Sequence, residues 1–288
     1  MKILVTGGTG RVGTAVVQAL LRGDASVRIL TRNKAAKLPI GVEAAVGDLL
    51  NPESVQSALN GVDKLFLLVG KAADELVQAL LGFAAARQAK VEHLTYLSVY
   101  QAERFADVPH FVAKHAVETA LKAFGIPFTI LRPAYFFQND SQLRAALTGP
   151  GLYPIPIGQA GIAAVDVRDV ADAAAVSLTT DEHAGKTYNL IGPNPLSGPG
   201  AAAVWSKTLS RPVKYAELSW VAVEEQLRQM FPGWLAMDLR LMFQGYHEHG
   251  FAPTNADVAA TTRLIGHAPR HYEDFVRETA AEWGTSAR

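Results

Sequence analysis

The residues with the clearest chemical potential are glycines near the N-terminus. The sequence VTGGTGRVG places Gly7, Gly10 and Gly13 three residues apart, and it also contains the pattern Gly8-x-Gly10-x-x-Gly13. One glycine in such a run permits a tight turn, another lets the backbone approach a pyrophosphate, and a third lets a helix pack closely on a strand. The helix that follows offers N–H groups and the positive end of its dipole to phosphates. We expect cofactor contacts from Gly7, Thr9, Gly10, Arg11, Val12 and Gly13.

The end of the second expected strand indicates which dinucleotide binds. An NAD site normally carries Asp or Glu there, whose carboxylate accepts hydrogen bonds from the ribose 2′-hydroxyl. This strand instead ends in RILTRNK, which supplies Arg32 and Lys34. A guanidinium can pair with a 2′-phosphate, so Arg32, with weaker support from Arg11, favours NADP(H) over NAD(H). Lys34 is explained equally well as a solvated loop charge.

Strand-like and helix-like segments alternate in the first half of the chain, and these elements must position the residues named above. The expected strands are residues 3–6, 26–31, 44–46, 64–69, 93–98 and 128–131. The expected helices are residues 13–22, 52–59, 74–89 and 111–123. Strands that alternate with helices, and are apolar on both faces, predict an α/β fold with a doubly wound parallel sheet of the Rossmann type.

The second half of the chain has a different pattern. Residues 148–161 are rich in Gly and Pro and lead away from the sheet, and a helix at 169–178 and a strand at 186–191 return to it. After the breaker cluster at 192–200, the pattern is mostly helical. We therefore expect an NAD(P)-binding domain at 1–150, to which the chain returns at about 163–192, and a smaller, mainly helical substrate-binding lobe at 151–288.

Composition excludes several classes of function. The 288 residues carry 27 basic and 27 acidic side chains, a balance that argues against direct nucleic-acid binding. The absence of cysteine excludes disulfides, thiolate catalysis and zinc–thiolate sites. We expect no metal site, because His247 and His249 lie two apart and would face different sides of a helix. With no signal-peptide pattern and no span-length apolar run, we expect a cytoplasmic protein without a membrane segment.

Taken together, the motifs resemble the NmrA-like group of the atypical short-chain dehydrogenase/reductase superfamily. The segments that carry the resemblance are TGGTGRVG, TRN after the second strand, GDL at 47–49, LSV at 97–99, HFVAKHAVETALKAFGIPFTILRPAYFFQN at 110–139 and VDVRDVA at 165–171. They cover residues 1 to about 190. The resemblance implies that Asp48 sits beside the adenine, with Leu49 among the cofactor contacts, and that Lys114 lies near the nicotinamide ribose. It also places Ser98 at the position of the superfamily's catalytic serine or threonine, and ligands of such sheets do bind at the carboxyl ends of the strands.

One position departs from the superfamily. Its reductases carry Tyr-x-x-x-Lys on one helical face, where the lysine lowers the pKa of the proton-donating tyrosine. This chain has His110-x-x-x-Lys114. His110 is either the acid, since histidine titrates near neutral pH, or a partly exposed residue at the helix start. Tyr100 and Tyr135 either replace the missing tyrosine or pack in the core, and Lys114 is either catalytic or a solvated helix lysine.

The resemblance leaves two functions open. One is an NADPH-dependent reductase that passes hydride to a small apolar acceptor such as a quinone, for which a tyrosine acid is less necessary. The other is a non-catalytic NADP(H)-binding redox sensor that acts on a regulatory protein partner. A sugar-nucleotide or lactone-modifying enzyme is disfavoured, because the Tyr-x-x-x-Lys pair is missing.

Overall fold

The computed structural model describes residues 1–284, and these form two compact units. Unit 1 consists of Met1–Arg104, His110–Pro133 and Val167–Leu190. Unit 2 consists of Phe105–Pro109, Ala134–Asp166 and the chain from Ile191 onward. Residues 134–150, which we expected in the first domain, group with unit 2. The last four residues of the expected second domain lie outside the described part of the chain.

Unit 1 contains a sheet of seven parallel strands in the order β10-β6-β5-β4-β1-β2-β3. The strands are β1 (Lys2–Thr6), β2 (Ser26–Thr31), β3 (Glu43–Val46), β4 (Lys64–Leu67), β5 (His93–Leu97), β6 (Phe128–Pro133) and β10 (Lys186–Leu190). The strand order reverses direction between β1 and β4, and ligands of doubly wound sheets bind at such a switch point. The predicted parallel sheet is confirmed, and the observed strand ends lie within two residues of the expected ones.

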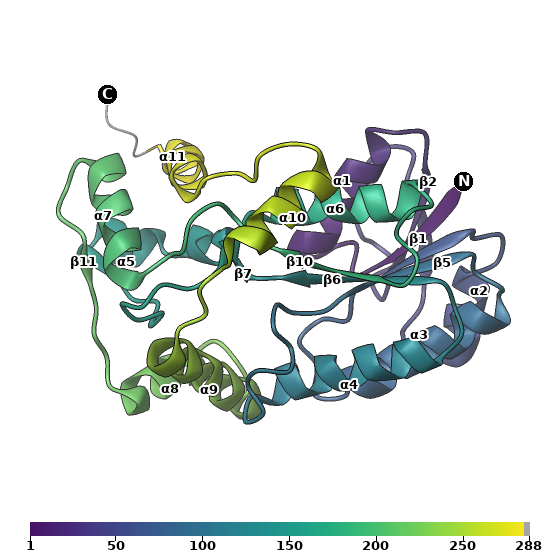
Figure 1. Ribbon diagram of the computed structural model, residues 1–288, viewed down its shortest axis with the longest axis horizontal. Coiled ribbons are helices and arrows are strands. Elements are labelled where there is room, and N and C mark those ends of the chain that lie inside the picture. The colour runs from purple at the N-terminus through teal and green to yellow at the C-terminus, as the bar shows by residue number, and fades with distance from the viewer. Residues whose placement is uncertain (285–288) are drawn as a thin grey trace. The chain divides into compact units, whose positions relative to one another are not determined.

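Helices cover both faces of this sheet (Figure 1). On one face lie α1 (Arg11–Leu21) and α6 (Val167–Thr179), which pack against each other. On the other lie α2 (Pro52–Ala58), α3 (Glu75–Gln88) and α4 (Pro109–Ala123). Local sequence explains their beginnings and their packing. Asn51 caps α2 by accepting a hydrogen bond from the backbone N–H of Ser54, and α1 buries an apolar face that includes Val16 and Leu20.

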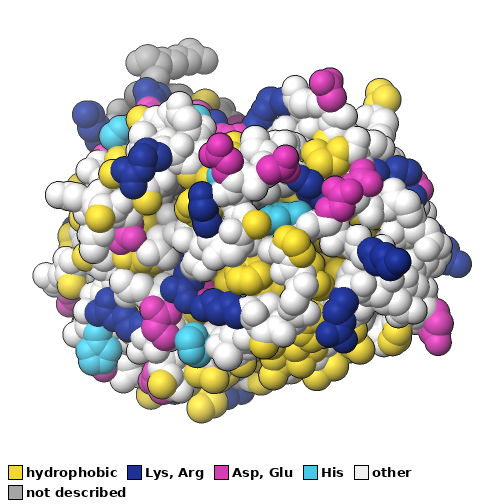
Figure 2. Space-filling model, turned by 45° about the vertical axis from the view of Figure 1, so that its right-hand side comes forward, with side chains coloured by type: hydrophobic (Ala, Val, Ile, Leu, Met, Phe, Trp, Pro, Cys, Tyr) yellow, Lys and Arg dark blue, Asp and Glu magenta, His cyan; other side chains and the backbone are white. Residues whose placement is uncertain are grey.

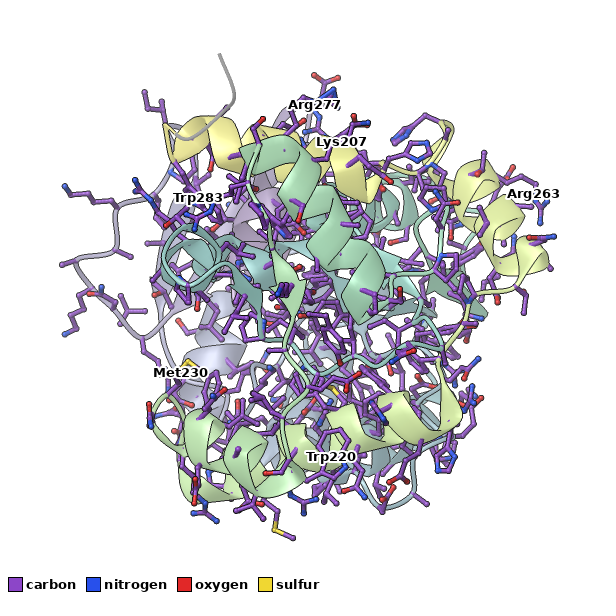
Figure 3. The ribbon with its side chains drawn as sticks, turned by 90° about the vertical axis from the view of Figure 1, so that its left-hand side faces the viewer. Lys207, Trp220, Met230, Arg263, Arg277 and Trp283 are labelled. Atoms are coloured by element: carbon purple, nitrogen blue, oxygen red, sulfur yellow. The ribbon has the colours of Figure 1, made fainter. Side chains whose placement is uncertain are left out.

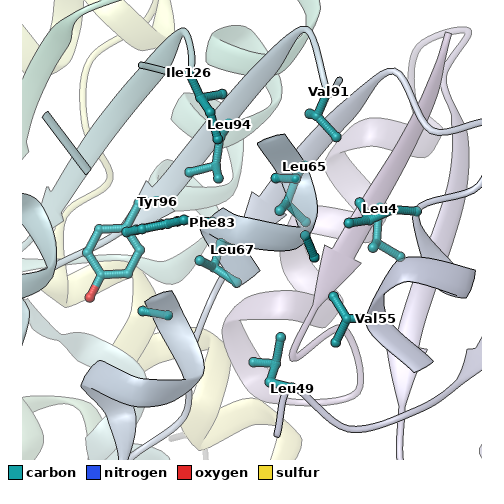
Figure 4. Close-up of a cluster of buried hydrophobic side chains, with 14 of the residues drawn as sticks. Leu4, Leu49, Val55, Leu65, Leu67, Phe83, Val91, Leu94, Tyr96 and Ile126 are labelled. Atoms are coloured by element: carbon teal, nitrogen blue, oxygen red, sulfur yellow. The ribbon is translucent and has the colours of Figure 1, made fainter. Parts of the chain in front are cut away.

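A hydrophobic cluster of unit 1 lies between the sheet and α2, α3 and α4 (Figure 4). Leu65 and Leu67 of β4 meet Phe83 of α3, whose ring contacts the ring of Tyr96 edge-on at 6.3 Å between centroids. Every residue of β4 and β5 is buried, because helices cover both sides of these central strands. The edge strand β3, in contrast, is mostly exposed.

Unit 2 is mainly helical, with two short pairs of parallel strands. The strands are β7 (Tyr135–Phe136) with β9 (Ala164–Val165), and β8 (Leu152–Tyr153) with β11 (Lys214–Tyr215). The helices are η1 (Phe137–Gln142), α5 (Arg144–Thr148), α7 (Gly198–Leu209), α8 (Trp220–Arg228), α9 (Gly233–His249), α10 (Asn255–Ile265) and α11 (Tyr272–Glu282). Trp283, which follows α11 and is labelled in Figure 3, stacks on Trp205 of α7 at 5.0 Å between ring centroids.

A buried carboxylate, Asp140, lies at the centre of unit 2. It accepts hydrogen bonds from the hydroxyls of Tyr135 at 3.3 Å, Tyr153 at 2.9 Å and Tyr272 at 2.5 Å. Burial raises the pKa of Asp140 to about 6, although the three hydroxyls act in the opposite direction. Burial also raises the pKa of Tyr135 well above its usual value. Of the two roles considered for Tyr135, the structure therefore favours packing over proton donation.

The surface mixes charges of both signs. On the face shown in Figure 2, Lys and Arg side chains lie among Asp and Glu side chains, and hydrophobic side chains gather along its lower part. None of the helices within residues 1–284 has both the length and the apolar character needed to cross a membrane.

Candidate functional site

The glycine turn connects β1 to α1 at the carboxyl edge of the sheet. Gly7 has a φ of +64°, a conformation that residues with a Cβ rarely adopt. The N–H of Gly10 closes the turn by donating to the carbonyl oxygen of Gly7 at 2.9 Å. The hydroxyl of Thr14, one turn into the helix, donates to the carbonyl oxygen of Gly8 at 3.2 Å. The turn is therefore held by its own backbone and by the helix that follows.

Gly10 and Gly13 have different surroundings. A Cβ on Gly13 would lie 2.1 Å from the carbonyl oxygen of Gly7 and 2.7 Å from the Cα of Gly8, so helix α1 can approach the turn only without a side chain there. A Cβ on Gly10 would meet only the carbonyl oxygen of Gly7, at 3.3 Å, and Gly10 is exposed. Gly13 is required by the fold, whereas Gly10 leaves the space in front of the helix open.

The first turn of α1 faces this open space. Gly10 is the N-cap in an extended conformation, and no side chain caps the helix. The first N–H groups of a helix have no partner within the helix, so they are available to an anion. Thr9 and Arg11 are exposed, whereas the side chain of Val12 is buried. Val12 can therefore serve a cofactor only through its backbone.

Arg32 lies at the end of β2 beside Asp48. Its guanidinium is 3.9 Å from the Asp48 carboxylate, and its side chain is 84% exposed. An exposed pair at this distance contributes about 1 kcal/mol or less, so a phosphate can readily replace the carboxylate. Asp48 also accepts a hydrogen bond from the N–H of Leu50 at 2.9 Å, which fixes the turn after β3. The side chain of Leu49 belongs to the hydrophobic cluster, so only its backbone can contact a cofactor.

Lys114 of α4 is mostly buried and is held by a carboxylate. Its Nζ lies 2.5 Å from Oε1 of Glu75 and 3.4 Å from the carbonyl oxygen of Leu97, and its side chain is 14% exposed. The hydroxyl of Tyr96 donates to the same oxygen of Glu75 at 3.3 Å. Burial, followed by the charges of Glu75 and Glu118, raises the pKa of Tyr96 well above its usual value. Lys114 is thus not the solvated lysine that we considered.

Ser98, at the carboxyl end of β5, is part of a second buried network. Its hydroxyl donates to Oε1 of Glu118, which is fully buried. The guanidinium of Arg132 donates to both oxygens of Glu118, at 2.8 and 2.5 Å, and lies 3.3 Å from Glu103. Burial alone would lower the pKa of Arg132, but the hydrogen bond and charge of Glu118 outweigh it and raise the pKa. Because the Ser98 hydroxyl donates to Glu118, Ser98 has only lone pairs left and no further donor.

His110 is the candidate acid at the start of the His110-x-x-x-Lys114 pattern. It lies in the first turn of α4, is half-buried, and its ring meets the Phe111 ring at 4.8 Å between centroids. Tyr100 is buried, and its backbone N–H donates to the carbonyl oxygen of Pro133. In unit 2, the ring of His247 packs edge-on against Trp220 at 5.5 Å between ring centroids.

Sequence reasoning missed four charged residues of these networks: Glu75, Glu103, Glu118 and Arg132. A signal for Glu118 was present, since it lies four residues after Lys114 and therefore on the same face of α4. Arg132 lies at the carboxyl end of β6, the edge at which ligands of such sheets bind. Glu75 gave no such signal, because its pairing with Lys114 joins residues 39 apart in the chain.

Known proteins of the same fold combine this architecture with NADP(H). The triphenylmethane reductase of Citrobacter sp., solved with NADP(H), is 29% identical with a TM-score of 0.86, over 96% of this chain and 99% of that one. The NADPH-dependent quinone oxidoreductase of Escherichia coli, solved with NADPH, is 26% identical with a TM-score of 0.85 and the same coverage. The NAD(P)H azoreductase of Xenophilus azovorans is 30% identical over 292 residues, or 99% of this chain and 100% of that protein. The model of the NmrA-like family matches residues 1–276, so the predicted resemblance is confirmed and the chain belongs to the NmrA-like family.

Proposed function

We propose that the protein is an NADPH-dependent oxidoreductase that passes hydride to a small, planar, apolar acceptor of the quinone class. The observation that carries the proposal is the glycine turn, which leaves Thr9, Gly10 and Arg11 exposed at a helix N-terminus that no side chain caps. Backbone N–H groups in this arrangement suit a pyrophosphate. The relatives named above use NADPH or NAD(P)H, in agreement with this assignment.

Arg32 and Arg11 support NADP(H) over NAD(H). Both are exposed near the glycine turn, and Arg32 has only a weak partner in Asp48 at 3.9 Å. A 2′-phosphate offers a guanidinium a charge-assisted, bidentate contact that a ribose hydroxyl cannot offer. We therefore assign the 2′-phosphate to Arg32, with Arg11 as the second candidate cation.

The charged networks at the carboxyl edge favour an acceptor that needs little acid catalysis. When bound, NADPH supplies the hydride. The Ser98 hydroxyl donates its hydrogen bond to Glu118, and the Tyr96 hydroxyl donates its hydrogen bond to Glu75. Neither group is therefore placed to protonate a carbonyl oxygen. A quinone accepts hydride readily, so positioning provides most of the catalysis and the proton can come from His110 or from water.

The test is NADPH oxidation by the purified protein, without oxygen, against a panel of benzoquinones and naphthoquinones. We expect turnover that depends on the quinone, with NADPH preferred to NADH as the donor. Gly10→Val is the matched control, because the substitution fills the open space at the turn and leaves the charged networks untouched. Turnover equal to that of the Gly10→Val variant for every quinone would contradict the proposal.

A second candidate is a redox sensor that binds NADP(H) without turnover and acts on a protein partner. The observation that favours it is the pairing of Lys114 with Glu75, together with histidine at position 110 where reductases carry tyrosine. Tight NADPH binding without quinone turnover would favour this candidate. Affinity capture with and without NADPH would then be compared, and a set of captured proteins that does not change with the cofactor would exclude the sensor.

A further inference from the structure

Glu75 is a buried carboxylate at the first position of α3, where the positive end of the helix dipole stabilises negative charge. It is 4% exposed, and its Oε1 accepts hydrogen bonds from Lys114 at 2.5 Å and from the hydroxyl of Tyr96 at 3.3 Å. Three independent elements, α3, α4 and β5, thus meet at this one oxygen. Such convergence fixes the position of the Lys114 ammonium.

Stability alone does not account for a charge pair at this place. Two buried charges lose their hydration, and well-packed apolar residues of similar size usually stabilise a protein as well or better. This pair lies at the carboxyl edge of the sheet, since Nζ of Lys114 is also 3.4 Å from the carbonyl oxygen of Leu97, the last residue of β5. Ligands of doubly wound sheets bind at this edge.

We propose that Glu75 is a positioning residue of the cofactor site, which holds the Lys114 ammonium where the nicotinamide ribose of NADPH binds. The inference rests on the proposed function. An ammonium has three N–H groups, and Glu75 and Leu97 accept two of them. The two contacts fix the direction of the third, which is left for a ribose hydroxyl. Tyr96 supports the arrangement by holding the Glu75 carboxylate from the strand side.

The test separates the two halves of the cofactor by calorimetric titration. One probe is NADPH, and the other is adenosine 2′,5′-bisphosphate, which lacks the nicotinamide ribose. We expect Glu75→Gln to weaken NADPH binding about tenfold and to change adenosine 2′,5′-bisphosphate binding less than twofold. The control Glu92→Gln makes the same isosteric change at an exposed residue beyond the opposite end of β5, and we expect wild-type affinity for both probes.

A double-variant cycle tests whether Glu75 acts through Lys114. We expect Lys114→Met to weaken NADPH about tenfold, and Glu75→Gln combined with Lys114→Met to weaken it no further. The double variant leaves no unpaired buried charge, so it should fold even if one of the single variants does not. In that case the double variant alone tests the proposal. It should fold, bind adenosine 2′,5′-bisphosphate like the wild type, and bind NADPH about tenfold more weakly.

The outcomes discriminate among the explanations. Equal weakening of both probes by Glu75→Gln would mean that Glu75 supports only the general structure of unit 1, and the proposal would be overturned. The proposal would also be overturned if the loss of NADPH affinity in the double variant were the product of the two single losses. Wild-type NADPH affinity in the double variant would overturn it as well. A wild-type protein that binds neither probe would refute the proposed function itself, and this inference with it.

Discussion

The glycine turn and the α4 face, which consists of Lys114 and Glu118 with their partners Glu75 and Arg132, lie at the same edge of the same sheet but are built in opposite ways. The turn is made of backbone, is exposed at Thr9, Gly10 and Arg11, and leaves a helix end without a side-chain cap. The α4 face is made of buried side-chain charges, each of which already has a partner within unit 1. The turn is therefore ready for an anion, whereas the α4 face can only orient a ligand through groups that its own pairs hold in place.

We expect the largest effect from Gly13→Ala, which tests whether the stability of the protein depends on the close backbone packing at the turn. In Gly13→Ala, the new Cβ would lie 2.1 Å from the carbonyl oxygen of Gly7, and neither backbone segment can move away without disturbing β1 or α1. We expect a loss of about 4 kcal/mol or more in the free energy of unfolding, measured by urea denaturation. The control Gly23→Ala, at an exposed position where the Cβ has no contact closer than 3.7 Å, should change it by less than about 0.5 kcal/mol. Equal stability of the two variants would contradict the assigned role of Gly13.

The next effect tests the charge pairs of the α4 face. Glu118→Gln keeps the shape of the side chain but leaves Arg132 facing an amide in a buried site, and we expect a loss of about 3 kcal/mol in the free energy of unfolding. Glu103→Gln is the matched control, because Glu103 contacts the same guanidinium at 3.3 Å but is 53% exposed. The Glu103→Gln variant should lose less than about 1 kcal/mol in the free energy of unfolding. Similar losses in both variants would mean that burial does not distinguish the two partners of Arg132.

Asp140 of unit 2 provides a comparison with Glu118, because its hydrogen-bond donors are neutral hydroxyls and not a guanidinium. The donors to Asp140 in unit 2 are tyrosine hydroxyls, and burial raises its pKa from 3.8 to about 6. The folded state therefore keeps a proton that the unfolded chain releases, so the contribution of Asp140 to stability is largest at low pH and is lost as the pH rises from about 4 to about 6.

This shift in the pKa of Asp140 corresponds to a loss of about 3 kcal/mol in the free energy of unfolding between pH 4 and pH 6. The measurement is the difference in unfolding free energy between the wild type and Asp140→Asn at several pH values, which cancels the titration of other groups. We expect this difference to fall between pH 4 and pH 6 and to stay constant above. A difference independent of pH would contradict the raised pKa.

The same contrast explains how much of the molecule could be predicted from its sequence. The seven-stranded sheet and the glycine turn were predictable, because strand–helix alternation and glycine spacing are local patterns. The partners of Lys114 and Ser98 were not, because Glu75 pairs with Lys114 across 39 residues and Glu118 accepts the hydrogen bond of Ser98 across 20. No local pattern records such pairs, which form only when α3, α4 and β5 are brought together. The sequence thus indicates the turn and the individual residues Lys114 and Ser98, whereas the pairs that hold these residues appear only in the folded structure.

Gly10→Val tests the open space at the turn. The backbone of Gly10 is extended, with φ at −86° and ψ at 172°, a conformation that valine adopts readily. Its Cβ would lie 3.3 Å from the carbonyl oxygen of Gly7, a contact that a shift of a few tenths of an ångström relieves, so the fold should remain. Its side chain would occupy the space that we assign to the pyrophosphate. We expect NADPH and NADH affinity to fall at least 100-fold, or about 2.7 kcal/mol, by calorimetric titration. Urea denaturation of the free protein should show a loss of stability much smaller than that of Gly13→Ala. Retained cofactor affinity in the Gly10→Val variant would contradict the assignment.

The smallest expected effect concerns the choice between the two dinucleotides. Arg32→Ala removes an exposed guanidinium whose partner, Asp48, is 3.9 Å away, so the fold should not change. We expect NADPH affinity to fall about tenfold, or about 1.4 kcal/mol, because a charge-assisted contact with the 2′-phosphate is lost, and NADH affinity to change less than twofold. Lys34→Ala, two residues along the same loop, is the control that tests whether net positive charge alone has this effect. If the Arg32→Ala variant weakens both cofactors equally, the 2′-phosphate lies elsewhere on unit 1, and Arg11 becomes the next residue to replace.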